Sequence, residues 1–408
     1  MLSIKRIIPL ILVLSLGLVG CSNLNESSNS ESSSPISEDL KSSVVSNYAT
    51  IVYESYLDSL NQAKAMQTEI LSFLDAPSAE GLVAAQTAWK QARIPYGQTE
   101  GYRFYEGPID DEDGPEGQLN AWPLDEFYID YHADYPNGGI INGTDTITKE
   151  LIIGKNEQGG DANISTGYHA IEFLLWGQDT SIGAGAGERP YTDYVTDGTG
   201  TASNQDRRQT YLKLVTEILI TDLQSLVDEW DPTKSNLYRD TFLALESDVA
   251  IGKMLRGIGA LAEGELFAER LGAPLDDALL DADRRENEHS CFSDNTKSDV
   301  VQNAQSVQNV YLGTFTKADG SVVGNAAYSL YELGKKANSS LAEALKTSLE
   351  TTKDLADKIQ DPFDQEILST NTEGRARVSA VGTALEAEAK LIVDLGTALN
   401  ISVNTSID

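Results

Sequence analysis

Histidine and cysteine, two of the side chains that bind transition metals, are scarce in this sequence. Its 408 residues include three histidines and two cysteines. Two cysteines are too few for a disulfide framework or for a zinc site built on cysteine. None of the histidines, His132, His169 and His289, stands four residues from another, so the HExxH motif of zinc peptidases is absent.

Positive charge is also in short supply. Lysine and arginine total 30 against 63 aspartates and glutamates, which gives a formal net charge of −33. A surface of this sign excludes the binding of nucleic acid or anionic lipid through charge. It suits cations, and it argues against an anionic polysaccharide as ligand unless a cation bridges the two.

The start of the chain carries a targeting signal. Residues 1–20 contain two cations, Lys5 and Arg6, and no acid. The apolar run over 7–19 is shorter than a comfortable transmembrane helix, so we interpret this region as a signal peptide. The run leads into Val19-Gly20-Cys21, which resembles a bacterial lipobox, the motif in which the cysteine is lipidated. We therefore expect an exported chain, anchored to a membrane through a lipid on Cys21.

The next segment, 21–43, is rich in serine and poor in large apolar groups. It buries too little to offset its ordering entropy, so we expect a flexible leash between the anchor and a folded body. Ser22 resembles the sorting signal of Gram-negative lipoproteins for the outer membrane. We expect the body to face the periplasm or the cell surface.

Helical periodicity dominates the rest of the chain. Apolar residues recur at steps of three and four, the spacing of amphipathic helices, and no sustained period-two alternation indicates a sheet. The pattern predicts an all-α fold of two helical bundles, one over 44–230 and one over 231–408, with an uncertain boundary. Expected helices cover 44–74, 79–105, 165–176, 212–230 with Asn204 as its cap, 242–261, 296–313, 326–360 and 378–399.

The strongest candidate for chemistry is the pair formed by His169 and Glu172. Positions three apart share one face of a helix, so an imidazole and a carboxylate can reach one metal ion together. The pair adjoins the apolar stretch Phe173–Trp176, where a buried histidine and glutamate need partners. A metal ion or each other would serve, and the spacing leaves both readings open.

Three further clusters have plainer interpretations. Trp89, Arg93, Tyr96 and Glu100 follow steps of four, three and four, which fits a core stripe with an internal ion pair, although Glu100 offers a carboxylate for a metal. Glu263, Glu265, Glu269 and Arg270 favour a solvated helix face. Segment 284–294, which holds His289 and Cys291, is interpreted as a turn that opens the next helix. The acidic quartet 110–113 fits no calcium-binding loop and is expected to be a solvated turn.

Several blocks in order carry a family resemblance. Gly167–Glu172 resembles the GxHxxE signature of the imelysin family, and Ala88–Phe104 is similar to that family's first-helix signature. Leu119–Glu126 resembles its next block, and Glu288–Thr296 resembles the iron-regulated protein A branch. The resemblance implies two helical bundles related by pseudo-symmetry, export, and a link to iron uptake. It also brings a metallopeptidase label.

The resemblance and the residues together favour binding over catalysis. One histidine and one glutamate are too few ligands for a catalytic zinc unless remote residues complete the shell. We therefore expect an exported lipoprotein of iron acquisition that binds a divalent metal, iron in preference to zinc, and that works with iron-uptake components. The alternatives are an imelysin-type metallopeptidase and a metal-free scaffold for a partner or a polysaccharide. The expected ligands are His169, Glu172 and Glu100, with Arg93, Trp89, Tyr96, Glu265 and Arg270 around them or at an interface, and no catalytic residue is assigned.

Overall fold

The computed structural model describes residues 36–180 and 185–407. The expected signal peptide, Cys21 and most of the expected leash lie outside the described residues. The first described helix, α1, begins at Glu38, after Ser37 caps it by accepting the backbone N–H of Leu40. Across the described residues, none of the helices combines the length and the apolar character that crossing a membrane requires.

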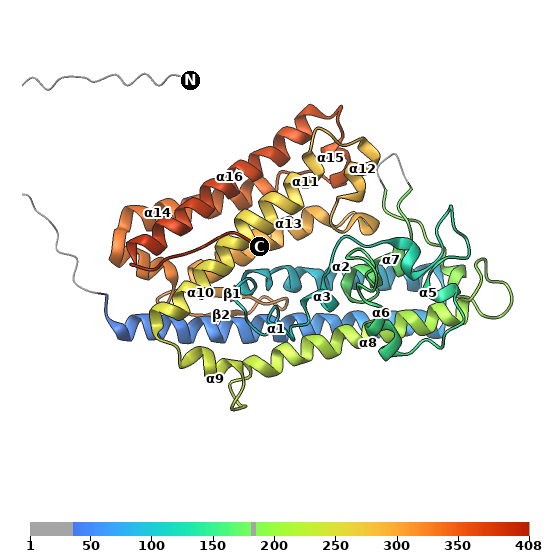
Figure 1. The fold of residues 1–408 in the computed structure, drawn as a ribbon, viewed down its shortest axis with the longest axis horizontal. Helices are drawn as coiled ribbons and strands as arrows, with labels where there is room; N and C mark the ends of the chain where they lie inside the picture. The colour runs from blue at the N-terminus through green and yellow to red at the C-terminus, as the bar shows by residue number, and fades with distance from the viewer. Residues whose placement is uncertain (1–35, 181–184, 408) are drawn as a thin grey trace, which may run out of the picture. The chain divides into compact units, whose positions relative to one another are not determined.

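The first half of the folded body is built on long helices packed side by side. Helix α1 (Glu38–Asp75) contacts α2 (Ala79–Gly97) and α8 (Gln205–Trp230) along its length (Figure 1). Helix α7 (Gly167–Trp176) packs against both α2 and α8. Shorter elements connect them: η1 (Glu100–Tyr102), α3 (Glu116–Leu119), α4 (Glu126–Ile129), α5 (Gly139–Asn142), α6 (Lys149–Lys155) and η2 (Tyr191–Tyr194).

The second half repeats the all-helical plan. Helices α14 (Leu330–Ala356) and α16 (Thr372–Ala398) lie side by side, and α13 (Thr296–Leu312) packs against α14 (Figure 1). Helix α10 (Ser247–Ala260) runs directly into a π-helix, η3 (Leu261–Gly272), which packs on α16. The remaining helices are α9 (Tyr238–Leu243), α11 (Ala273–Leu275), α12 (Asp281–Glu286), η4 (Cys291–Ser293) and α15 (Phe363–Ile367).

One large apolar core joins the two halves. Tyr48 of α1, Trp230 of α8 and Leu395 of α16 all belong to it, and each is almost wholly buried. A smaller core lies between η3, α15 and α16, around Phe363. Because α13 of the second half contacts α2 of the first, residues from both halves meet in the region around α7. The all-α fold class is confirmed, and the boundary near residue 230 stays a prediction.

Local details differ from the sequence expectations in several places. The helix expected over 79–105 ends at Gly97, and Glu100 lies in the separate turn η1. The helix expected over 242–261 is interrupted, because residues 244–246 separate α9 from α10. Asn204 precedes α8, but its amide donates to Asn142 instead of capping the helix. A two-stranded antiparallel hairpin, β1 (Thr314–Thr316) and β2 (Val322–Gly324), is too short to show period-two alternation in the sequence.

Candidate metal centre

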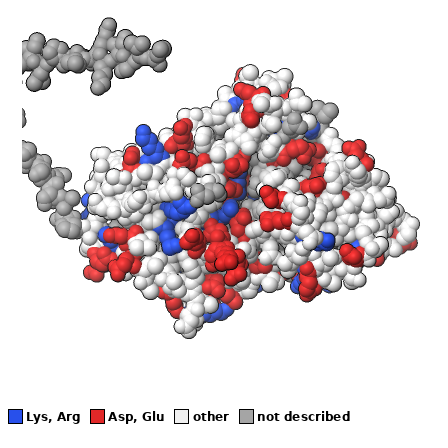
Figure 2. All heavy atoms as spheres, in the orientation of Figure 1, with Lys and Arg blue, Asp and Glu red and all other residues white. Residues whose placement is uncertain are grey.

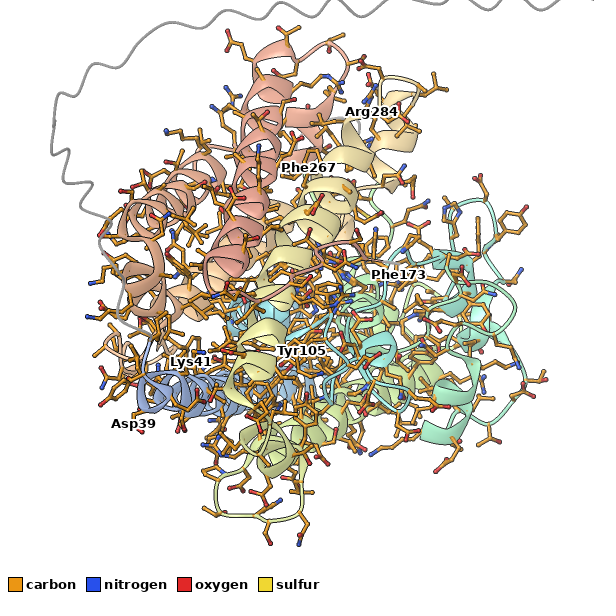
Figure 3. All side chains as sticks on the ribbon, turned by 60° about the vertical axis from the view of Figure 1, so that its left-hand side comes forward. Asp39, Lys41, Tyr105, Phe173, Phe267 and Arg284 are labelled. Atoms are coloured by element: carbon orange, nitrogen blue, oxygen red, sulfur yellow. The ribbon has the colours of Figure 1, made fainter. Side chains whose placement is uncertain are left out.

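Helix α7 places the predicted pair in the interior, with all ten of its residues buried. His169 Nδ1 lies 2.8 Å from Glu172 Oε2, and neither side chain is exposed to solvent. The helix starts at Gly167, whose φ of +82° and close approach to the Leu119 carbonyl suit glycine. Phe173, labelled in Figure 3, lies on the next turn of the same helix, and its ring centroid is 5.2 Å from that of Phe292.

A second histidine, which sequence reasoning missed, meets the first. His289 Nε2 lies 3.1 Å from His169 Nε2, and His289 Nδ1 lies 3.1 Å from Asp299 Oδ2. Ser290 and Asp294 hold left-handed backbone conformations, with φ of +61° and +54°, on either side of η4. The segment interpreted as a helix-opening turn thus also places the buried imidazole of His289 against that of His169.

Two carboxylates hold the two imidazoles from opposite sides. Glu172 keeps its second oxygen, Oε1, for the backbone N–H of Ser293 at 3.0 Å and the Ser293 hydroxyl at 2.7 Å. Asp299 Oδ2 also accepts the Ser290 hydroxyl at 2.5 Å. Each ring therefore has a fixed orientation, with Nδ1 on a carboxylate and Nε2 directed at the other ring. In metal sites this arrangement sets the tautomer of the ligand histidine.

Burial controls the charges of these four groups. It holds the pKa of His169 well below the usual value and, with Arg270, lowers that of His289 to about 3. It raises the pKa of Glu172 to about 8. At Asp299 burial also raises the pKa, but Arg93, His289 and Ser290 together outweigh it and hold the pKa below its usual range. Both imidazoles are consequently neutral at pH 7, the form that binds metals.

The proton positions follow from these charges. Ionised Asp299 accepts from Nδ1 of His289, so Nε2 of His289 presents a lone pair to His169. When Glu172 is protonated it donates to His169, which can then donate from Nε2 to His289. When Glu172 loses that proton, both Nε2 atoms present lone pairs to one another, and a cation between them relieves the contact.

Arg93 is tied to the pair through Asp299. Its guanidinium bonds Asp299 Oδ1 at 3.1–3.2 Å, and the side chain is 1% exposed. Three aromatic rings surround it, those of Trp89, Tyr96 and Tyr168, with centroids 5.7, 5.4 and 5.1 Å away. Trp89, Arg93 and Tyr96 are core residues of α2, as expected, but the expected ion pair between Arg93 and Glu100 is not formed. Arg93 pairs instead with Asp299, the acid that holds His289.

Glu100 lies in a neighbouring ion-pair network. Its carboxylate accepts from Arg103 at 2.9 Å and from Arg270 at 3.2 Å, and it is 1% exposed. Arg270 also pairs with Glu265 at 2.9 Å. These two residues are five apart, and the wide turn of the π-helix brings such positions to one face. The solvated face expected here instead contributes a buried arginine, only 3% exposed, to the network.

A cleft of about 380 Å³ leads to this region. Its lining includes His289, Trp122, Arg270, Glu265 and Glu116. The Trp122 ring lies over both imidazoles, with centroids 4.8 Å from His169 and 5.9 Å from His289. Solvent species therefore approach the histidine pair from the His289 side.

The two nitrogens fit a shared metal ion. Imidazole binds zinc at roughly 2.0–2.1 Å, so two adjacent nitrogens on one tetrahedral or octahedral ion lie roughly 3 Å apart. The observed 3.1 Å matches that separation. In the described part of the chain, no three histidine, cysteine, aspartate or glutamate side chains group as a ready ligand set. An ion held by this pair would keep coordination positions open to the cleft.

Comparison with known proteins agrees with the helical fold. The imelysin family model matches residues 52–392, most of the chain. The chain belongs to the imelysin family. A curated relative named iron-regulated protein A, from Synechococcus elongatus, is 27% identical over 345 residues, covering 83% of this chain and 80% of the relative.

Two solved structures share the imelysin fold of this chain. One is named as an iron-regulated protein A precursor from Parabacteroides distasonis ATCC 8503, with a TM-score of 0.60, 22% identity, and coverage of 88% of this chain and 97% of that one. The other is an imelysin-like protein from Psychrobacter arcticum 273-4, with a TM-score of 0.60, 14% identity, and coverage of 90% and 98%. At these identities the likeness shows the fold alone.

Proposed function

We propose that this imelysin-family chain binds a divalent metal ion, iron in preference to zinc, between His169 and His289 as part of iron acquisition. The observation that carries the proposal is the contact of the two Nε2 atoms at 3.1 Å, each ring being held at Nδ1 by a carboxylate. A bound metal would act there as a Lewis acid with open positions. The same proposal tethers the exported body to a membrane through lipidated Cys21.

In this proposal the residues of the site have two roles, as metal ligands and as groups that orient the ligands. His169 and His289 supply the nitrogen ligands, and Glu172 and Asp299 orient them. Glu172 was expected to be a ligand, but its two oxygens bond His169 and Ser293, so we assign it to positioning. Glu100, whose oxygens accept from arginines and Asn120, belongs with the network beside the cleft.

The preference for iron rests on the names of relatives and on the shape of the site. The Synechococcus elongatus relative carries the name iron-regulated protein A. Imidazole nitrogen suits both iron and zinc, but structural zinc sites are closed by four protein ligands. Two nitrogens beside an open cleft favour an ion that is taken up and passed on.

A metallopeptidase is the second candidate. The sequence lacks the HExxH motif. Glu172, the acid beside His169, is fully buried and bonded on both oxygens, so it is not placed to act as a general base on water in the cleft. We expect no hydrolysis of unstructured protein substrates that a chelator abolishes. Robust cleavage by the wild type, lost in Glu172→Gln, would place the enzyme first.

Calorimetric titration with Fe(II), under anaerobic conditions, and with Zn(II) tests the binding proposal. His169→Ala and His289→Ala should each weaken binding at least about tenfold, and the double variant should lose little more, because either loss breaks the shell. His132→Ala, which removes the third histidine, is the matched control and should bind like the wild type. Unchanged binding by both single variants would show that the pair is only a buried contact.

A further inference from the structure

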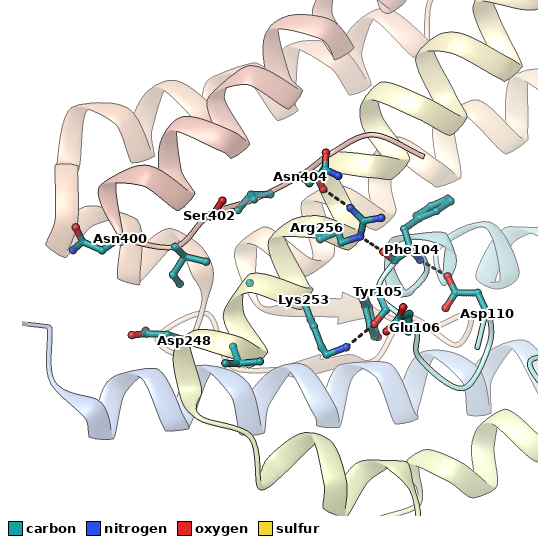
Figure 4. A pocket seen from close by; sticks show the side chains of 14 residues that line it. Phe104, Tyr105, Glu106, Asp110, Asp248, Lys253, Arg256, Asn400, Ser402 and Asn404 are labelled. Atoms are coloured by element: carbon teal, nitrogen blue, oxygen red, sulfur yellow. Dashed lines mark hydrogen bonds between the residues drawn. The ribbon is translucent and has the colours of Figure 1, made fainter. Parts of the chain in front are cut away.

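A second cavity, larger than the metal cleft, lies on α10. Its volume is about 750 Å³, and its walls are α10, the loop that follows η1, and the extended tail after α16 (Figure 4). Nothing in the proposed metal function uses this groove. The histidine pair does not line it.

Two cations stand on the α10 wall of this groove. Lys253 and Arg256, three residues apart on one face of the helix, are half-buried and line it together. Among the described residues neither has a carboxylate within 4.0 Å, although acids outnumber cations by 63 to 30. Figure 2 shows a group of basic side chains over α10, with acids around them.

The hydrogen bonds of these cations leave donors free. Lys253 Nζ donates to the Tyr105 carbonyl at 2.6 Å, and Arg256 donates to the carbonyls of Phe104 and, at 2.8 Å, Asn404 (Figure 4). A lysine has three donors and an arginine five, so both retain N–H groups for a ligand. Carbonyl partners also leave both positive charges uncompensated.

The acids on the walls are mostly engaged elsewhere. Asp248 pairs with Lys41 at 2.6 Å, and Asp110 accepts the backbone N–H groups of Phe104 and Gly107. Glu106 is the remaining acid of the lining. Asp110 turns its oxygens to the backbone of its own loop, so the groove offers a ligand the free N–H donors of Lys253 and Arg256 and the carboxylate of Glu106.

The rest of the lining is apolar or neutral. Val249 is 50% exposed and lines the groove, as do Phe104 and Ile401. Ser402 and Asn404, on the tail, contribute neutral polar groups. Apolar walls with a few placed polar groups are typical of small-molecule sites.

We propose that this groove binds a small organic anion, a carboxylate attached to an apolar body. The forked guanidinium of Arg256 and the ammonium of Lys253 hold the carboxylate, and Val249, one helical turn before Lys253, holds the apolar part. Guanidinium geometry matches a carboxylate, and partial burial strengthens the contact.

Benzoate is the probe, titrated calorimetrically into the full-length protein at low salt without metal. Benzamide has the same shape without the charge and should bind at least tenfold more weakly. Lys253→Gln and Arg256→Gln should each lower benzoate affinity at least tenfold, while Lys358→Gln, at an exposed lysine on another surface, should not change it. Equal binding of benzoate and benzamide, or no saturable benzoate binding, would overturn the proposal.

Replacing Lys253 or Arg256 also removes a hydrogen bond to the loop after η1, so a second variant keeps both cations. Val249→Glu adds a carboxylate to the groove rim, one helical turn before Lys253. It should abolish benzoate binding and keep the circular dichroism melting curve. Val83→Glu, at a valine 58% exposed on α2, is its matched control and should bind benzoate normally. Wild-type binding by Val249→Glu would contradict the assignment of the groove.

Discussion

His169 and His289, separated by 120 residues in the sequence, face each other through their Nε2 atoms at 3.1 Å. Each ring is turned into that position by a carboxylate on its other nitrogen, Glu172 for one and Asp299 for the other. Because the pKa of Glu172 is raised to about 8, Glu172 is protonated at pH 7 and one ring can donate from Nε2 to the other. Loss of that proton leaves a lone pair on both Nε2 atoms, so Glu172 and Asp299, outside the ligand shell, set the tautomers that make the two rings a pair of ligands.

Glu172→Gln should weaken metal binding by about 10–100-fold, because removing an acid that orients a ligand histidine has that effect in metal sites. The amide can still accept from Ser293, so the fold should persist. Calorimetric titration with Zn(II) measures the change. Glu388→Gln is the matched control, since Glu388 is also a buried glutamate, 1% exposed, but lies on α16 beside Thr352. Equal losses in both variants would contradict the positioning role.

Arg93 should be required for stability, because its loss leaves Asp299 charged and buried without a counter-ion. Both side chains are 1% exposed. Breaking such a pair costs about 3–5 kcal/mol, so Arg93→Met should lower the free energy of unfolding by that order. Lys353→Met, which breaks the half-exposed pair with Asp357, should cost less than about 1 kcal/mol. Urea denaturation measures the change in unfolding free energy for both variants. Equal losses would show that the ion pair of Arg93 with Asp299 contributes little to stability.

Glu388 should make stability fall as pH rises. Burial raises its pKa from 4.5 to about 7 in the folded chain. Between pH 4.5 and pH 7 the unfolded chain releases this proton while the folded chain keeps it. The stability that the neutral carboxyl gives the folded chain is therefore complete below pH 4.5 and is lost as pH rises through 7. Glu388→Gln should therefore gain stability relative to wild type between pH 5 and 8, by up to roughly 3 kcal/mol.

Denaturation curves at pH 5 and pH 8 provide the comparison. Glu350→Gln, at an exposed glutamate on α14, is the control for the change in net charge. A stability difference between Glu388→Gln and wild type that does not change with pH would show that the carboxyl titrates at an ordinary value.

The helices could be predicted because their signal is local. Apolar spacing identified α1, α8, α13 and α16 to within several residues, since one buried face imposes it on each helix. The same rule joined α9 to α10 across Glu246, because the apolar residues stay in phase over a break that the backbone makes.

The site could be predicted only in part. His169 and Glu172 share a helix face, and the sequence shows that spacing directly. The contact with His289 depends on left-handed backbone conformations at Ser290 and Asp294. The spacing of apolar residues does not predict such conformations. The burial of Arg270 depends on a π-helix, whose wider turn differs from the helical period that sequence patterns assume.

The membrane tether is a prediction about the start of the chain. Cys21→Ser should give protein that carries no lipid and moves from the detergent phase to the aqueous phase in a partitioning experiment. Cys291→Ser, at the buried second cysteine, is the control and should partition like the wild type. Detergent-phase partitioning that is unchanged in Cys21→Ser would contradict the lipoprotein interpretation.

The position of a bound metal tests the central claim most directly. Crystals soaked with Fe(II) or Zn(II), measured at the absorption edge of the metal, give an anomalous difference map that locates the ion without assumptions about its ligands. We predict one dominant peak within bonding distance of both Nε2 atoms, of His169 and His289, and its absence from crystals of His289→Ala. A dominant peak elsewhere, on the acidic surface or at Glu100, would contradict the account.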